Sequence, residues 1–128
     1  MKLNRKEFIT AASGAFLFAA LGGVPVSGEE KMYGLIGKMI AAEGKRDELI
    51  KILLEGTAKM PGCLSYIVAK DSTDENAVWI TEVWESEEHH KNSLSLPEVK
   101  KAIEKGKPLI AGFGERFVIE PVGGHGLK

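Results

Sequence analysis

The pattern of hydrophobic positions from residue 32 onward predicts strands and helices in alternation. A first strand is expected over Met32–Ala42, where apolar residues occupy both sets of alternating positions, as in a strand that packs on both faces. A helix is expected to begin near Asp47, because apolar or small residues recur at helical spacing. These residues are Leu49, Ile52, Leu53, Gly56 and Met60, and Pro61-Gly62 is expected to end the helix.

The middle of the chain predicts a β-hairpin. In Cys63–Lys70, the residues Leu64, Tyr66 and Val68 alternate with Ser65, Ile67 and Ala69, as expected for the two faces of a strand. A polar turn over residues 71–76 follows, and Ala77–Glu85 is dense in residues that favour strands. The two segments are therefore expected to pair.

The last third predicts two short helices and a closing strand. Ser86 has the character of a helix N-cap, and the helix after it carries His90, Leu94 and Leu96. Pro97 suits the first position of another helix. Leu109–Pro121 is expected to be a strand, and the glycine-rich tail over residues 122–128 is expected to be loose.

The resulting order, β-α-β-β-α-β, is the ferredoxin-like split βαβ arrangement of the α+β class. Such a sheet has helices on one face only. Because the strands are apolar on both faces, a monomer would expose a large apolar sheet surface. We therefore expect a homodimer in which two sheets pack face to face.

Residues 1–28 have the pattern of a signal sequence. Lys2, Arg5 and Lys6 precede an apolar run from Ile9 to Leu21, and small residues make cleavage after Gly28 plausible. The run is shorter than the ~20 residues of a spanning helix, which argues against a stable membrane anchor. A periplasmic or extracellular domain over residues 29–128, with its core at 32–121, is expected.

The export route stays open. The stretch from Asn4 to Ile9 resembles a twin-arginine motif, but Lys6 stands where the second arginine belongs. The alternative to a signal sequence is a buried or membrane-associated N-terminal helix.

Composition excludes some classes of function. The 128 residues carry a net charge of -1 without a basic stripe, which argues against a nucleic-acid partner. The single cysteine, Cys63, excludes an intrachain disulfide, and no Cys/His cluster has the spacing of a zinc site.

Three stretches, Pro61–Tyr66, Glu82–Ser86 and His90–Leu94, resemble the antibiotic biosynthesis monooxygenase domain, and within it the small quinol monooxygenases. The resemblance runs from about Met32 to Pro121. It implies a dimeric α+β barrel with a pocket between the sheet and the second helical region. It also implies oxidation of an electron-rich aromatic substrate by dioxygen, with no metal, flavin or haem cofactor.

Oxygen activation without a cofactor requires a base, because a phenol donates an electron more readily as its anion. His90 stands where the family pattern has its histidine, and histidine titrates near working pH. We expect His90 to act as the base or to hydrogen-bond the substrate oxygen; the alternative is a solvated helix histidine. His89 leaves the helix about 100° away and is not expected to face the same pocket.

Three further residues are candidates for substrate binding. Trp84 is expected to stack on a planar ligand, or else to pack in the core, on the face of the strand opposite to Trp79. Glu82 shares its face and could orient His90 or a substrate hydroxyl; the alternative is an exposed or salt-bridged acid. The Tyr66 phenol could hold a substrate oxygen or remain in the core.

Two other functions fit the same pattern. The domain could bind a small aromatic ligand without reaction, or it could bind or degrade haem with His90 as the iron ligand.

Overall fold

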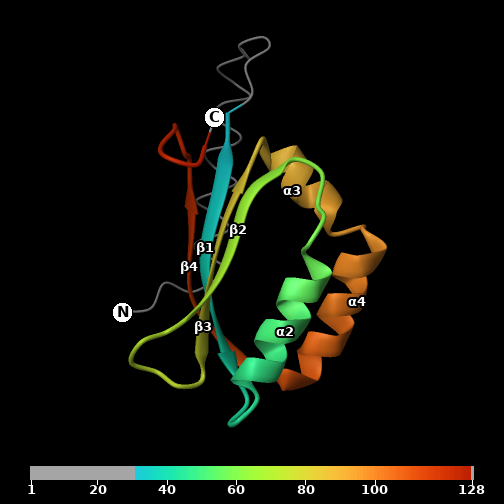
Figure 1. Ribbon diagram of the computed structural model, residues 1–128, viewed down its shortest axis with the longest axis vertical. Helices are drawn as coiled ribbons and strands as arrows, with labels where there is room; N and C mark the ends of the chain where they lie inside the picture. Colours follow the sequence, from blue (N-terminus) through green and yellow to red (C-terminus); the bar gives the residue numbers. More distant parts are fainter. Residues whose placement is uncertain (1–30, 128) are drawn as a thin grey trace, which may run out of the picture.

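The computed structural model describes residues 31–127, so the predicted signal sequence and Lys128 lie outside the described residues. Two layers form the domain: a four-stranded antiparallel sheet in the order β2-β3-β1-β4, and helices on one face of it (Figure 1). The elements are β1 (Tyr33–Ala41), α2 (Arg46–Gly56), β2 (Cys63–Lys70), β3 (Ala77–Trp84), α3 (Glu87–Ser93), α4 (Pro97–Gly106), the 3₁₀ helix η1 (Lys107–Leu109) and β4 (Ile110–Ile119). This order and topology confirm the predicted ferredoxin-like α+β fold. None of the helices within residues 31–127 has the length and apolar character to span a membrane.

The register of the sheet decides which side chains share a face. In β3, Glu82 pairs with Leu35 of β1 and with Tyr66 of β2, and Trp84 pairs with Tyr33. Directly paired residues of antiparallel strands project to the same side of the sheet. That side carries the core against the helices, where Trp84, Leu49 and Val78 are the largest fully buried side chains.

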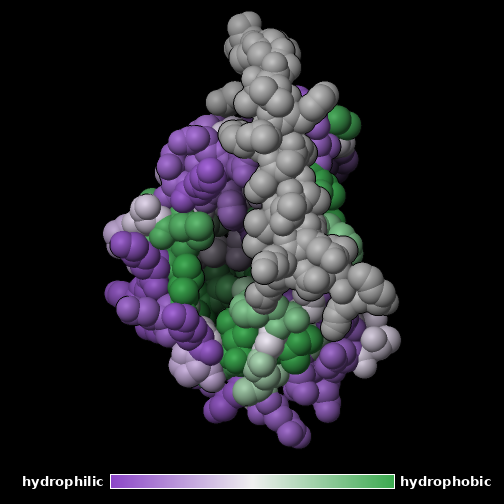
Figure 2. Space-filling view, turned by 180° about the vertical axis from the view of Figure 1, so that it is seen from behind, coloured by the Kyte–Doolittle hydropathy of each residue, from purple (hydrophilic) through white to green (hydrophobic). Residues whose placement is uncertain are grey.

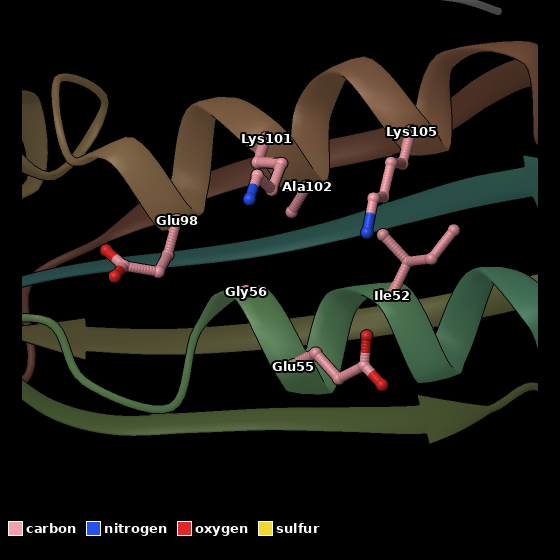
Figure 3. Close-up of a pocket in the computed structure, with 7 residues that line it drawn as sticks. All are labelled: Ile52, Glu55, Gly56, Glu98, Lys101, Ala102 and Lys105. Carbon is pink, nitrogen blue, oxygen red and sulfur yellow. The ribbon is translucent and has the colours of Figure 1, made fainter.

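Helices α2 and α4 lie side by side on the sheet and touch through small residues. A Cβ atom on Gly56 would collide with the Cβ of Ala102, so only glycine permits this approach of the two helices. A shallow groove runs between them, with Ile52 and Glu55 on one wall and Lys105 on the other (Figure 3).

The predicted end of the first helix was wrong by about one turn. Helix α2 ends at Gly56 and not at Met60. Thr57 is the C-cap of the helix, and its backbone N–H and hydroxyl both donate to the carbonyl of Leu53, at 3.2 and 2.6 Å. Met60 instead lies in the loop before β2, where its carbonyl accepts from the N–H of Cys63 at 3.0 Å.

The last third of the chain contains the two predicted helices, but the first of them is shorter than expected. Ser86 is the N-cap of α3, and its hydroxyl accepts from the N–H of His89 at 3.2 Å. Helix α3 ends at Ser93, so Leu94 and Leu96 lie outside it, and Pro97 occupies the first turn of α4 as expected.

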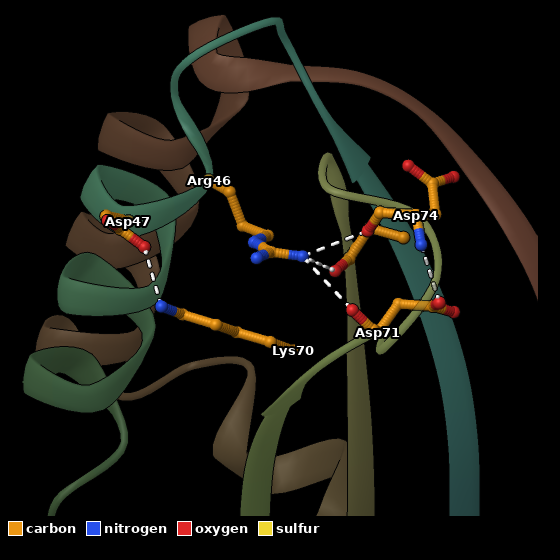
Figure 4. A network of polar contacts seen from close by, with 6 residues as sticks. Arg46, Asp47, Lys70, Asp71 and Asp74 are labelled. Atoms are coloured by element: carbon orange, nitrogen blue, oxygen red, sulfur yellow. Dashed lines mark hydrogen bonds and ion pairs between the residues drawn. The ribbon is translucent and has the colours of Figure 1, made fainter.

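The turn between β2 and β3 is fixed to the helix layer by one guanidinium (Figure 4). Arg46 Nη1 donates to the carbonyls of Asp71, Asp74 and Ala77 at 3.4, 2.9 and 3.3 Å. The Asp71 carboxylate in turn accepts from the N–H groups of Thr73 and Asp74 at 2.8 and 2.9 Å. These bonds to the Asp71 carboxylate hold its pKa well below the usual range.

We expect Arg46→Met to destabilise the domain by about 2 kcal/mol, because charge-assisted hydrogen bonds are lost while the apolar stem is kept. The matched control is Lys70→Met, which removes an exposed ion pair with Asp47 at 3.3 Å and should cost less than about 1 kcal/mol. Urea unfolding of the two variants measures both effects. Equal stabilities would contradict the anchoring role of Arg46.

Candidate functional site

The helix-facing side of the sheet gathers ionisable and aromatic side chains beneath α3. Each strand contributes at least one of them. They are Tyr33 from β1, Tyr66 from β2, Glu82 and Trp84 from β3, His90 from α3, and Arg116, which pairs with Gly37 on the helix-facing side of β4. The structure thus brings together the four residues predicted from the sequence and adds Tyr33 and Arg116.

Trp84 and Glu82 form one unit. The indole Nε1 of Trp84 donates to Glu82 Oε1 at 2.9 Å. Trp84 is only 1% exposed, so its ring has no face open for stacking on a ligand, and the expected stacking role must be corrected. Its observed role is to fix a largely buried carboxyl group, whose side chain is 16% exposed.

His90 lies across this unit. Its ring meets Trp84 edge-on with centroids 5.5 Å apart, and it lies 5.4 Å from the ring of Tyr33. His90 Nε2 is 3.9 Å from Glu82 Oε1, and the histidine side chain is 17% exposed. This separation exceeds a hydrogen bond, so the two groups are close neighbours without a direct hydrogen bond.

His89 turns away from this cluster, as the helical geometry predicts. Its Nδ1 lies 2.8 Å from the hydroxyl of Ser86, and its Nε2 lies 3.7 Å from Glu85. The ring covers Gly62, where φ is +84° and a Cβ atom would collide with the imidazole. Gly62 therefore serves a turn and a close contact that other residues do not permit.

Burial controls the protonation of the central pair. It raises the pKa of Glu82, against the opposing effects of the Trp84 hydrogen bond and the Arg116 charge. It lowers the pKa of His90, and the positive charge of Arg116 lowers it further, against the opposing charge of Glu87. His90 is thus a neutral acceptor at pH 7, beside a carboxyl that holds its proton more strongly than usual.

The two phenols stay protonated. Burial raises the pKa of Tyr66 far above its usual value, and the Glu82 and Cys63 charges add to the effect. Burial and the charge of Glu87 raise the pKa of Tyr33, while Arg116 opposes this through its charge and a hydrogen bond. Both phenols therefore remain available as hydrogen-bond donors.

Sequence reasoning missed Tyr33 and Arg116 as site residues. Tyr33 lies in the first predicted strand, where the pattern marks it only as one of several apolar positions. Arg116, together with the adjacent Glu115, interrupts the apolar run of the last strand, and this pair of charges is a usable signal. The pairing of Tyr33 with Trp84 depends on the strand order, which no local pattern reveals.

Residues 31–127 contain no group of three or more His, Cys, Asp or Glu side chains placed to hold a metal ion.

Comparison with known proteins points to one family. The model of the antibiotic biosynthesis monooxygenase family matches residues 32–105. The crystal structure of a candidate antibiotic biosynthesis monooxygenase from Chloroflexus aurantiacus J-10-fl is 62% identical, with a TM-score of 0.74, covering 76% of this chain and 99% of that one. No curated protein matches the sequence.

More distant structures share the fold. A candidate antibiotic biosynthesis monooxygenase from Caulobacter crescentus CB15 is 23% identical with a TM-score of 0.67, covering 73% of this chain and 92% of that one. Another from Nitrosomonas europaea is 11% identical with a TM-score of 0.63, covering 76% and 94%.

The electrostatic arrangement can be tested by NMR titration of His90. Removal of the positive charge in Arg116→Gln should raise the His90 pKa, because the imidazolium is then less disfavoured. Glu87→Gln is the matched control of opposite sign and should lower it. A His90 pKa that does not respond to Arg116→Gln would mean that the guanidinium does not act on the ring.

Proposed function

Because the chain belongs to the antibiotic biosynthesis monooxygenase family, we propose that it oxidises a quinol or a related electron-rich phenol with dioxygen at His90 and Glu82. The supporting observation is the His90 side chain. It is partly accessible, its pKa is lowered, and it lies 3.9 Å from a buried carboxyl group. A neutral imidazole in this position suits removal of a phenolic proton.

In the proposed reaction, His90 accepts the proton of a substrate hydroxyl. A proton on Nε2, facing Glu82, leaves Nδ1 as the acceptor, and the ionised form of Glu82 stabilises the imidazolium that forms. The phenolate gives one electron to dioxygen, and the phenoxyl radical and superoxide combine at a ring carbon. With the proton returned, the hydroperoxide loses water, so one oxygen atom enters the ring and a quinol yields a hydroxyquinone.

The surrounding residues support this chemistry. Arg116 adds positive charge near an oxygen atom that becomes negative, which favours the phenolate. The phenols of Tyr33 and Tyr66 stay protonated and can donate to a substrate oxygen. Trp84 acts through Glu82 and is therefore a positioning residue.

We expect His90→Ala to lower oxygen uptake with a quinol by roughly 10²–10⁴-fold, the range for loss of a general base. Anaerobic binding of the quinol should largely persist, because apolar burial supplies most of the affinity. An oxygen electrode, with the spontaneous oxidation subtracted, measures the rate. The wild-type kcat/KM should rise with pH through a transition whose midpoint lies below pH 6.5, because the His90 pKa is lowered from 6.5.

The control is His89→Ala, whose side chain contacts Ser86 and Gly62 instead of the site. Its rate should stay close to that of the wild type. Equal activity of His90→Ala and wild type would exclude His90 as the base. Tight quinol binding without oxygen uptake would assign the protein to the non-enzymatic binders, and a Soret band after haem addition would favour haem binding.

We also propose that the domain is a homodimer. The sheet face opposite to the helices carries Ile67 and Phe117, which are 53% and 49% exposed. These residues pair with Thr81 and Ile36 across the sheet, so they share this face. Burial of such a surface against a second copy is favourable.

Light scattering of residues 29–128 at micromolar concentration should give the mass of a dimer. Phe117→Glu should shift the mass to that of a monomer, because it places a charge in the apolar interface. Leu54→Glu, at an exposed position of α2 on the helix layer, should leave the dimer intact. A wild-type monomer would disprove the proposed assembly.

The signal-like pattern of residues 1–28 further supports the proposal that this domain acts after export, in the periplasm or outside the cell.

A further inference from the structure

Gly37 lies in an inner strand of the sheet, and no close packing contact requires a glycine at this position. It lies in β1, between Ile80 of β3 and Arg116 of β4. A Cβ atom built on Gly37 meets nothing within 4 Å, whereas a Cβ on Gly34 would press against the side chain of Ile119. A glycine in a strand interior weakens the strand, and it often marks a place where a ligand approaches the backbone.

The open space over Gly37 lies on the same side of the sheet as the site. Residues 33, 35 and 37 alternate to one face of β1, and the first two pair with Trp84 and Glu82. The space is therefore between the sheet and the helix layer. Figure 2, which shows the molecule from behind, shows a hollow with hydrophobic residues to its left and below it and hydrophilic residues above it.

The helices leave the β4 side of this face uncovered. Val118 and Phe113 of β4 pair with Leu35 and Met39 and so point to the helix-facing side. Both are exposed, whereas the matching positions of β3 are Val78, which is fully buried, and Glu82, whose side chain is 16% exposed. The space over Gly37 thus continues toward an apolar and open edge.

The spacing relates Gly37 to the reactive pair. Leu35, the partner of Glu82, precedes Gly37 by two residues, which corresponds to roughly 7 Å along a strand. A substrate whose hydroxyl reaches His90, whose ring plane lies along the sheet and whose second fused ring extends along β1 would place that second ring over Gly37. A single ring would leave this space empty.

We propose that Gly37 is the floor of the substrate pocket and determines whether an aromatic substrate can carry a second fused ring. This assignment rests on the proposed function, since it takes His90 as the end of the pocket where the substrate hydroxyl binds. The missing side chain leaves room for a second fused ring, and a larger residue would fill that room.

The test compares a one-ring and a two-ring substrate, hydroquinone and 1,4-dihydroxynaphthalene, in wild type, Gly37→Ala and Gly37→Leu. Anaerobic affinity is measured by calorimetry, and oxygen uptake is measured separately. Gly37→Leu should weaken binding of the two-ring compound by about tenfold or more, as for overpacking of a filled space. Binding of hydroquinone should change less than about threefold, and Gly37→Ala should fall between.

Gly112 provides a matched control. It is a strand glycine of β4 whose Cβ would also meet nothing within 4 Å, but it pairs with Ile40 and faces the other side of the sheet. Gly112→Ala should leave both affinities unchanged. Thermal melting of all variants identifies any loss of folding, and Gly37→Ala, whose added methyl group meets no atom, keeps the comparison valid if Gly37→Leu unfolds.

The outcomes separate the two proposals. Size-selective loss of binding without oxygen uptake by the wild type would support the pocket floor and exclude the monooxygenase function. Equal losses for both compounds, or none for either, would overturn the role of Gly37. Failure of the wild type to bind either compound would overturn both.

Discussion

The hydrogen bond from Trp84 to Glu82, 2.9 Å long, is the interaction on which the site depends. A carboxyl group under a helix layer loses water and is costly to ionise. The indole N–H compensates part of that cost and fixes the position of the oxygen that faces His90. Because the same indole ring is the largest fully buried side chain, the packing of the core and the geometry of the site cannot vary independently.

The sheet register carries this constraint to the other residues. The pairings of Glu82 with Tyr66 and of Trp84 with Tyr33 place two phenols beside the carboxyl and the indole. Only Glu85 and Ser86 separate Trp84 from the start of helix α3 at Glu87, and Ser86 is its N-cap. That short connection sets the helix over the end of β3, so that His90 faces the sheet while His89 covers Gly62.

Much of this arrangement could be predicted from the sequence because it depends on local periodicity. The alternation of β3 placed Glu82 and Trp84 on one face, and helical spacing separated His89 from His90. Periodicity could not predict the end of α2. Met60 has helical spacing, but the helix ends at Gly56, and the Thr57 hydroxyl after it donates to the carbonyl of Leu53. The burial of Trp84 depends on long-range packing, and the position of Arg116 in the site depends on the strand order. No local sequence pattern contains either.

The helices cover the helix-facing side of the sheet unequally, and this difference gives solvent and ligands a route to the site. Helices bury the β3 side of the helix-facing surface, which shifts the pKa values of Glu82 and His90 in opposite directions. The β4 side of the same surface keeps exposed apolar residues. A ligand that enters over β4 would therefore move from an apolar, open region toward a polar, buried pair. Full coverage would protect the pair but close the entrance, whereas no coverage would restore the ordinary pKa values. The arrangement of helices on this sheet satisfies both requirements, and Gly37 lies at the boundary between the two regions.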